Sequence, residues 1–164
     1  IFERVPAFSY GLHSALNYLG FDFSMFWEGV YDQDVYNNQK FQTDFWAVND
    51  PGSNKGTRLL NAWNTNNTSS SIPRLSTMNT ADEGRASSYF VENGSYLKLR
   101  TLQFGYNIPK DILSKVKMSS VRLYVSGQNL LTIKSKSLTC SDPENPDWNY
   151  PLATSLSFGL QVGF

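Results

Sequence analysis

The last ten residues of the chain alternate strictly between apolar and small or polar side chains. One parity holds serines, glycines and a glutamine, and the other holds Leu156, Phe158, Leu160, Val162 and Phe164. A period of two is typical of a β-strand with one apolar and one polar face. Small side chains suit the inner wall of a wide barrel, whose apolar face then points outward to lipid. Soluble β-proteins also end in amphipathic strands, so this segment alone leaves both architectures open.

The composition narrows the class of protein. Aromatic residues make up 15% of the 164 residues and charged residues 17%, with 14 basic and 14 acidic side chains. Balanced charge gives no electrostatic reason to expect a nucleic-acid partner. Apolar runs are too short for a membrane-spanning helix, which excludes a helical membrane protein. A barrel remains open, because barrel strands are only half apolar, although lectin-like sandwiches share this composition.

Residues 1–6 do not resemble a secretory signal. Because a barrel must be exported, we expect that a signal was removed or that the natural N-terminus lies upstream. Cys140 is the single cysteine, which excludes an internal disulfide framework. We expect it to be an ordinary loop residue, with a partner elsewhere in a longer chain as the alternative.

Alternation predicts four further strands. Residues 8–18 and 21–30 flank Leu19-Gly20, a short connection typical of a β-hairpin. Residues 95–106 and 120–130 form the third and fourth strands, and 154–164 the fifth. In the third strand the apolar parity switches between Leu99 and Leu102. Either a β-bulge near Arg100 corrects the pattern, or Lys98 and Arg100 lie above the hydrocarbon band, where charge costs little.

Long and short connections alternate along the chain. Residues 31–88 and 132–151 show no sustained periodicity, whereas the connection after residue 106 resembles a short helical turn opened by Pro109. Outer-membrane barrels have long external loops and short periplasmic turns. Five antiparallel strands are too few to close a barrel that holds a ligand. The predicted fold class is therefore all-β: antiparallel strands that form the last part of a larger transmembrane barrel.

Several motifs, in the right order, resemble TonB-dependent transporters of the SusC/RagA type. Residues 93–109, NGSYLKLRTLQFGYNIP, resemble the family signature dGsYlRLrnltLGYtlP, and residues 121–132, VRLYVSGQNLLT, resemble its next block, lRlYvsgqNLfT. Residues 20–29, 63–67, 72–75, 142–144 and 150–151 resemble further family blocks. The resemblance covers nearly the whole chain and concerns the C-terminal part of the barrel only.

This resemblance implies a barrel of about 22 strands with a plugged lumen, in the outer membrane of a Bacteroidetes-type bacterium. Such a protein imports oligosaccharides or peptides, driven by TonB, and works with a SusD-like surface lipoprotein. The plug and the N-terminal domains, through which TonB acts, have no counterpart in residues 1–164. Outer-membrane lipid and the barrel-assembly machinery are the other implied partners. No cofactor is implied, and the protein is expected not to be an enzyme.

Three groups of residues are candidate contact sites. Aromatic side chains in the predicted loops can stack on a substrate or pack against a partner, or they can pack the loops themselves; these are Trp46, Trp63, Trp148 and Tyr150. The last strand resembles the signal that the barrel-assembly machinery reads by edge pairing, or merely ends apolar; its residues are Phe158, Leu160, Val162 and Phe164. Aromatic girdles form at strand ends, and the candidates, with core packing as the alternative, are Tyr10, Tyr18, Phe21, Trp27 and Tyr106.

Other site chemistries find little support. His13 is the only histidine, and without a second histidine or a cysteine nucleophile it forms no catalytic dyad. Asp22 and Glu28 are the only weak candidates for the paired carboxylates of a glycosidase, and their spacing is too wide. Residues 142–147 offer several oxygen ligands, but two prolines and no glycine turn do not match a calcium loop. We therefore expect no metal there and a rigid, solvated loop.

A soluble β-sandwich that binds glycans is the main alternative to the barrel. It makes a structural prediction of its own: Phe158, Leu160 and Val162 should be buried against a second sheet.

Overall fold

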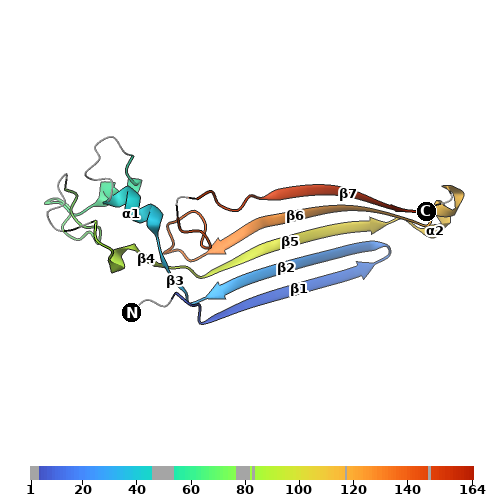
Figure 1. Ribbon diagram of the computed structural model, residues 1–164, viewed down its shortest axis with the longest axis horizontal. Helices are drawn as coiled ribbons and strands as arrows, with labels where there is room; N and C mark the ends of the chain where they lie inside the picture. The colour runs from blue at the N-terminus through green and yellow to red at the C-terminus, as the bar shows by residue number, and fades with distance from the viewer. Residues whose placement is uncertain (1–3, 46–53, 77–81, 83, 117, 148) are drawn as a thin grey trace.

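A computed structural model describes residues 4–45, 54–76, 82, 84–116, 118–147 and 149–164. Five strands form an antiparallel sheet in the order β1-β2-β5-β6-β7. They are β1 (Phe8–Tyr18), β2 (Phe21–Tyr31), β5 (Tyr96–Asn107), β6 (Ser120–Lys134) and β7 (Ser155–Gly163). The long loops lie at one end of the sheet, and the short connections lie with the C-terminus at the other (Figure 1). The all-β class is confirmed.

The short connections follow from their residues. Leu19 and Gly20 both have positive φ, 47° and 87°, as expected for a two-residue hairpin turn. A side chain at Gly20 would also approach the carbonyl oxygen of Asn107 to 2.9 Å. Between β5 and β6, Pro109 immediately precedes α2 (Lys110–Leu113), which η4 (Ser114–Val116) extends. This is the helical turn that Pro109 predicted.

A β-bulge at Arg100 explains the parity switch in β5. Leu99 pairs with Trp27 and Thr101 with Phe26, so the register shifts at Arg100. The pairing with β6 shifts at the same place. The extra residue lets the leucines before the bulge and the apolar residues after it share one face of the sheet. Of the two explanations that the sequence left open, the bulge is the one the structure contains.

The sheet is open at both edges. Among the described residues, β1 pairs with β2 alone and β7 with β6 alone, so each has one unpaired edge. No helix in the described part of the chain is long and apolar enough to cross a membrane.

The first long connection is more ordered than the sequence suggested. It contains β3 (Asp34–Tyr36), which pairs with β4 (Val91–Asn93), the helix α1 (Asn38–Asp44), and the 3₁₀ turns η2 (Thr57–Asn61) and η3 (Ser88–Phe90). Asn37 caps α1 by accepting a hydrogen bond of 2.9 Å from the Lys40 amide. Phe90 is fully buried, and its ring packs edge-on against Phe41 and Phe45. Packing, which the local sequence does not reveal, stabilises these short elements.

Candidate functional site

The outer face of the sheet is apolar and uncovered. Strand pairing places Leu16, Phe23, Phe104, Val125 and Phe158 in one row across all five strands. The side chains of β7 are the most telling, with 80% of Phe158, 62% of Leu160 and 37% of Val162 exposed. A second sheet would bury them, so the prediction of the soluble sandwich is wrong for this chain. A continuous exposed apolar face of this size marks an interaction surface.

Aromatic rings gather at both ends of the outer face. Near the β1–β2 turn, the ring centroid of Phe21 lies 4.5 Å from Tyr106, and Tyr18 pairs with Phe21. At the loop end, Phe8 lies 5.9 Å from Tyr10 and 5.2 Å from Tyr31. Phe21 and Tyr31 are the two ends of β2, about 33 Å apart at roughly 3.3 Å per residue. A tilt of about 40° reduces this to about 25 Å, the height of a barrel's apolar band.

Trp27 does not belong to either aromatic end. It pairs with Leu12 and Leu99 within the sheet, and its indole nitrogen donates to the Met25 sulfur at 3.4 Å. The girdle prediction therefore fits the positions of Tyr10, Tyr18, Phe21 and Tyr106 and is wrong for Trp27.

The opposite, inner face is polar. Ser24, Gln103, Ser126 and Ser157 form one row across it, and the exposed His13 lies on the same face of β1. Near the turn end, Arg122 donates to both carboxylate oxygens of Asp22, at 2.9 and 2.5 Å.

Glycines on this face make room for its larger side chains. A Cβ at Gly105 would lie 2.5 Å from the Asp22 carboxylate.

Glu28, the other carboxylate of β2, pairs with Arg100 at 2.7 Å. Because Asp22 and Glu28 pair with different arginines, they do not form the carboxylate pair of a glycosidase.

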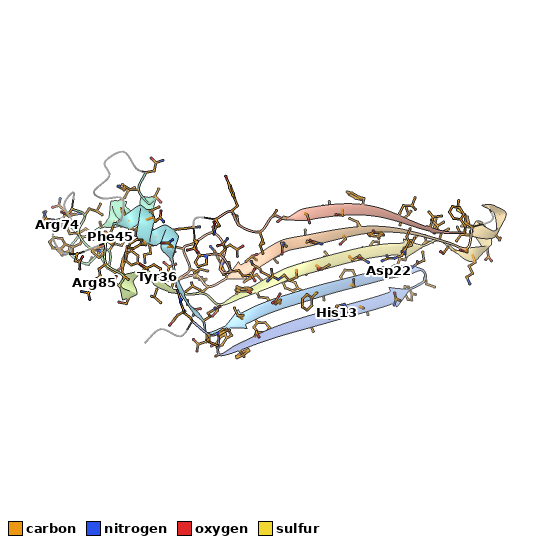
Figure 2. All side chains as sticks on the ribbon, in the orientation of Figure 1. His13, Asp22, Tyr36, Phe45, Arg74 and Arg85 are labelled. Carbon is orange, nitrogen blue, oxygen red and sulfur yellow. The ribbon has the colours of Figure 1, made fainter. Side chains whose placement is uncertain are left out.

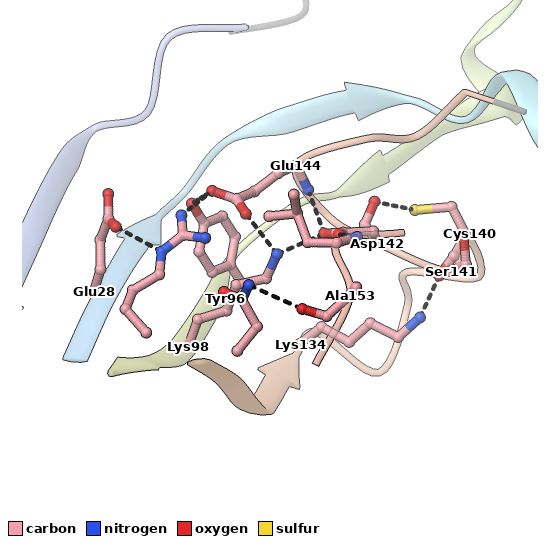
Figure 3. Close-up of polar contacts among 12 residues, drawn as sticks. Glu28, Tyr96, Lys98, Lys134, Cys140, Ser141, Asp142, Glu144 and Ala153 are labelled. Atoms are coloured by element: carbon pink, nitrogen blue, oxygen red, sulfur yellow. Dashed lines mark hydrogen bonds and ion pairs between the residues drawn. The ribbon is translucent and has the colours of Figure 1, made fainter. Parts of the chain in front are cut away.

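The loop end of the inner face carries a dense ion-pair network (Figure 3). The Lys98 side chain is 2% exposed, and its amino group lies 2.7 Å from Asp142 and 2.5 Å from Glu144. Glu144 also accepts hydrogen bonds from Arg100 and, at 2.8 Å, from the Tyr96 hydroxyl. Both carboxylates come from the β6–β7 loop, residues 135–154. The network therefore joins that loop to the wall.

These contacts shift the titration of both loop carboxylates. Burial raises the pKa of Asp142, but hydrogen bonds from Lys98 and from the backbone amides of Glu144 and Leu152 outweigh it and lower the pKa. Burial likewise raises the pKa of Glu144, and hydrogen bonds from Arg100, Lys98 and Tyr96 outweigh it. Both groups are therefore ionised at neutral pH.

The expectation of a solvated loop at residues 142–147 is wrong for Asp142, which is buried. Glu144 is exposed as a residue, although only 25% of its side chain is accessible. The sequence did not reveal the burial of Asp142 because its partner, Lys98, lies 44 residues earlier in the chain. Among the described residues no cluster of three or more His, Cys, Asp or Glu is arranged to hold a metal ion.

Cys140 is a core residue and not an ordinary loop residue. It is fully buried, and together with Val35 and Leu138 it forms a small hydrophobic cluster under the loops. Its thiol donates to the Asp142 carbonyl at 3.4 Å, and burial raises its pKa.

A second polar cluster joins the two long loops to each other. Glu92 of β4 accepts hydrogen bonds from the Asn37 side chain at 2.9 Å and from the Thr139 amide at 2.8 Å. Lys40 of α1 lies 3.4 Å from Glu92. Burial raises the pKa of Glu92, but the hydrogen bonds and the lysine together lower it. The loops are therefore one packed unit rather than two independent segments.

The predicted aromatic contacts are scattered over this loop unit. Trp63 is 37% exposed and lines a cavity of about 440 Å³ together with Leu59, Arg74 and Leu75. Tyr150 is 97% exposed. Figure 2 places Arg74 at the far end of the loops from the sheet. Trp46 and Trp148 lie outside the described residues, so no common aromatic site is seen.

A further cavity, which sequence reasoning missed, lies where the loops meet the wall. Its volume is about 540 Å³, and Tyr96, Glu144, Val30, Asp147 and Arg4 are among the residues that line it. The lining comes from four separate segments, so nothing local in the sequence marked it.

No family model matches the chain. Among curated proteins, TonB-dependent receptor P3 of Formosa agariphila is 36% identical over 130 residues, which is 79% of this chain and 12% of that receptor. TonB-dependent receptor P26 of the same bacterium is 27% identical over 175 residues, covering 98% of this chain and 17% of the receptor. The chain thus spans only a small part of the relatives that it matches.

Solved structures of the RagAB peptide importer have the same fold. In its open-open and closed-closed states, the match covers 98% of this chain and 17% of the solved chain, with a TM-score of 0.74 and 23% identity. The two relatives are receptors and the solved structures are those of an importer, and none of them is an enzyme. The sequence similarity identifies the chain as a section of a TonB-dependent receptor, and its fold is that of part of the RagAB importer.

Proposed function

We propose that the chain supplies wall and external loops to an outer-membrane, TonB-dependent importer. One observation carries the proposal: a single continuous sheet has an exposed apolar face on one side and an ion-paired polar face on the other. Lipid covers the first face, and nutrients pass along the second after the plug of the full protein rearranges. An open sheet of five strands needs further strands on both edges to enclose that path.

The cargo that we propose is an oligosaccharide or a peptide. The RagAB protein, which has the same fold, is a peptide importer, and this supports the peptide class. The cavity of about 540 Å³ at the junction of loops and wall is large enough for a small ligand. Trp63 and Tyr150 are exposed for contact with cargo or partner. Trp46 and Trp148 are proposed for the same role on their position in the loops alone.

Two protein partners are proposed for the full-length importer. A SusD-like lipoprotein covers the loop unit, and TonB acts through N-terminal parts of the full protein. Residues 1–164 then form the C-terminal barrel section, and the plug lies elsewhere in the polypeptide. The balanced charge gives no reason to propose a nucleic-acid partner.

We propose that β7 is the strand that the barrel-assembly machinery recognises. In the part of the chain that the structure describes, one edge of β7 has no partner strand. Phe158, Leu160 and Val162 of β7 are exposed, as is Phe164, which follows it. An exposed edge offers backbone groups for strand addition.

Deletion of the full-length gene tests the function. Cells with and without the gene are fractionated and then fed labelled peptides or labelled oligosaccharides. The proposal expects the protein in the outer-membrane fraction, soluble only with detergent, and loss of uptake of one cargo class, which wild-type cells take up chemically unchanged. A protein that remains soluble without detergent, or uptake that is unaffected by the deletion, would refute it.

A further inference from the structure

The β6–β7 loop is fastened across the loop end of the inner face by one buried cation. The Lys98 amino group lies between Asp142 and Glu144, at 2.7 and 2.5 Å, and the lysine is almost completely buried. Removing a buried ammonium from its carboxylates leaves uncompensated charge, which is strongly unfavourable. Substitution of Lys98 should therefore loosen the loop by more than the loss of a surface ion pair would.

Asp142 transmits this attachment to the loop backbone on both sides. Its carboxylate accepts hydrogen bonds from the Glu144 amide at 3.1 Å and from the Leu152 amide at 3.3 Å. Lys134, at the end of β6, donates to the Cys140 carbonyl. Residues near both ends of the loop, Lys134 and Leu152, are therefore bonded to the segment 140–142, which Lys98 contacts.

The first long loop is also bonded to the second at two places. Gln39 of α1 donates to the Ser141 hydroxyl at 2.9 Å and to the Asp147 carbonyl at 2.7 Å. Thr139 bonds to Glu92 of β4 through both its amide and its hydroxyl. A continuous set of contacts thus runs from Lys98 through residues 139–147 to α1 and β4.

We propose that Lys98 is a positioning residue that holds both external loops on the barrel wall as one unit. The β6–β7 loop is then a fixed strap, and it does not swing as a lid during transport. The inference rests on the proposed function only in taking the inner face as the lumen. Its consequence is that cargo enters by movement of other parts of the importer, while the strap stays in place.

Hydrogen exchange in the full-length protein, read by mass spectrometry, tests the strap. Lys98→Met removes the partner of Asp142, and Lys110→Met, at the exposed start of α2 on the far end of the sheet, is the matched control. We expect amides of residues 135–154 and of α1 to exchange at least tenfold faster in Lys98→Met and unchanged in Lys110→Met. Equal exchange in the two variants would overturn the inference.

A second comparison separates a strap from a lid. In the wild-type protein, exchange of residues 135–154 should be the same with and without a saturating peptide mixture; a tenfold rise with peptide would show a lid. Uptake by Lys98→Met cells should need at least tenfold more peptide for half-maximal rate, at an unchanged surface amount of protein. An unchanged half-maximal concentration would show that Lys98 does not position the loops.

Two controls keep the result interpretable. The heat-dependent gel shift of a folded barrel checks each variant, and if Lys98→Met fails to fold, the loop-side variant Asp142→Asn with Glu144→Gln must give the faster exchange instead. The hydrogen-exchange measurement does not depend on transport activity. Absence of uptake in wild-type cells would therefore refute the proposed function and leave the strap to be decided by exchange alone.

Discussion

Arginine substitutions at Leu12 and His13 test which face of the sheet meets lipid. The two residues are neighbours in β1 and point to opposite faces, Leu12 beside Trp27 on the outer face and His13 beside Phe26 on the inner face. Leu12→Arg should destabilise the barrel strongly, and His13→Arg should leave it nearly unchanged. Both variants add the same side chain at nearly the same height. A difference between their stabilities therefore reflects which face of the sheet carries the arginine.

The expected loss of stability in Leu12→Arg follows from how deep Leu12 lies within the apolar band. It lies four residues from Phe8 and six from Tyr18, the aromatic ends of β1. At about 3.3 Å per residue and a tilt of about 40°, it lies roughly 10 Å inside the nearer aromatic end. That is close to the middle of a band of about 25 Å, where an outward arginine costs about 2–4 kcal/mol. A polar surface substitution such as His13→Arg should change stability by less than about 0.5 kcal/mol.

Reversible folding of the full-length protein into phospholipid vesicles measures the effect. Urea titrations followed by the gel shift of the folded barrel give the free energy of unfolding for each variant. Equal stability of the two variants, or a larger loss for His13→Arg, would show that the face assignment is wrong.

Two further predictions concern the loop unit. Because the pKa values of Asp142 and Glu144 are lowered in the fastened state, their ionised forms stabilise the strap at neutral pH, and this stabilisation is lost only as the pH falls below the ordinary carboxyl pKa of about 4. Exchange of residues 135–154, corrected for the chemical rate, should therefore stay constant from about pH 8 to 6 and rise in acid; loosening above pH 6 would contradict this. Cys140, fully buried and with a raised pKa, should not react with maleimide until the protein is denatured, and rapid reaction of the native protein would show that the loop core is open.

The sequence predicted those elements whose signal is local. Period-two alternation marked β1 with the bounds that the structure has, and the misplaced parity around Arg100 pointed to the bulge. Leu19-Gly20 was recognisable because a two-residue hairpin favours positive φ. In each case the cause lies within a few residues of the effect.

What was missed depends on contacts between distant segments. The helix α1 has only seven residues and is held by Phe90 and Glu92, about fifty residues later, although Asn37 was a capping signal that could have been read. Asp142 and Glu144 resembled a solvated acidic loop because nothing nearby in the sequence neutralises them. Lys98 does so only once β5 and the loop are folded together.

The central claim is that alternate residues of the sheet face lipid and water, and thiol labelling of β7 tests it most directly. Phe158→Cys and Ser157→Cys place new thiols on opposite faces of one strand, and the parent protein, labelled in parallel, gives the background from other cysteines. In the full-length protein within outer membranes, we predict that a water-soluble maleimide labels position 157 rapidly and position 158 much more slowly, because a thiol that faces lipid stays protonated. Fast labelling of position 158 by the water-soluble reagent would contradict the membrane-wall account.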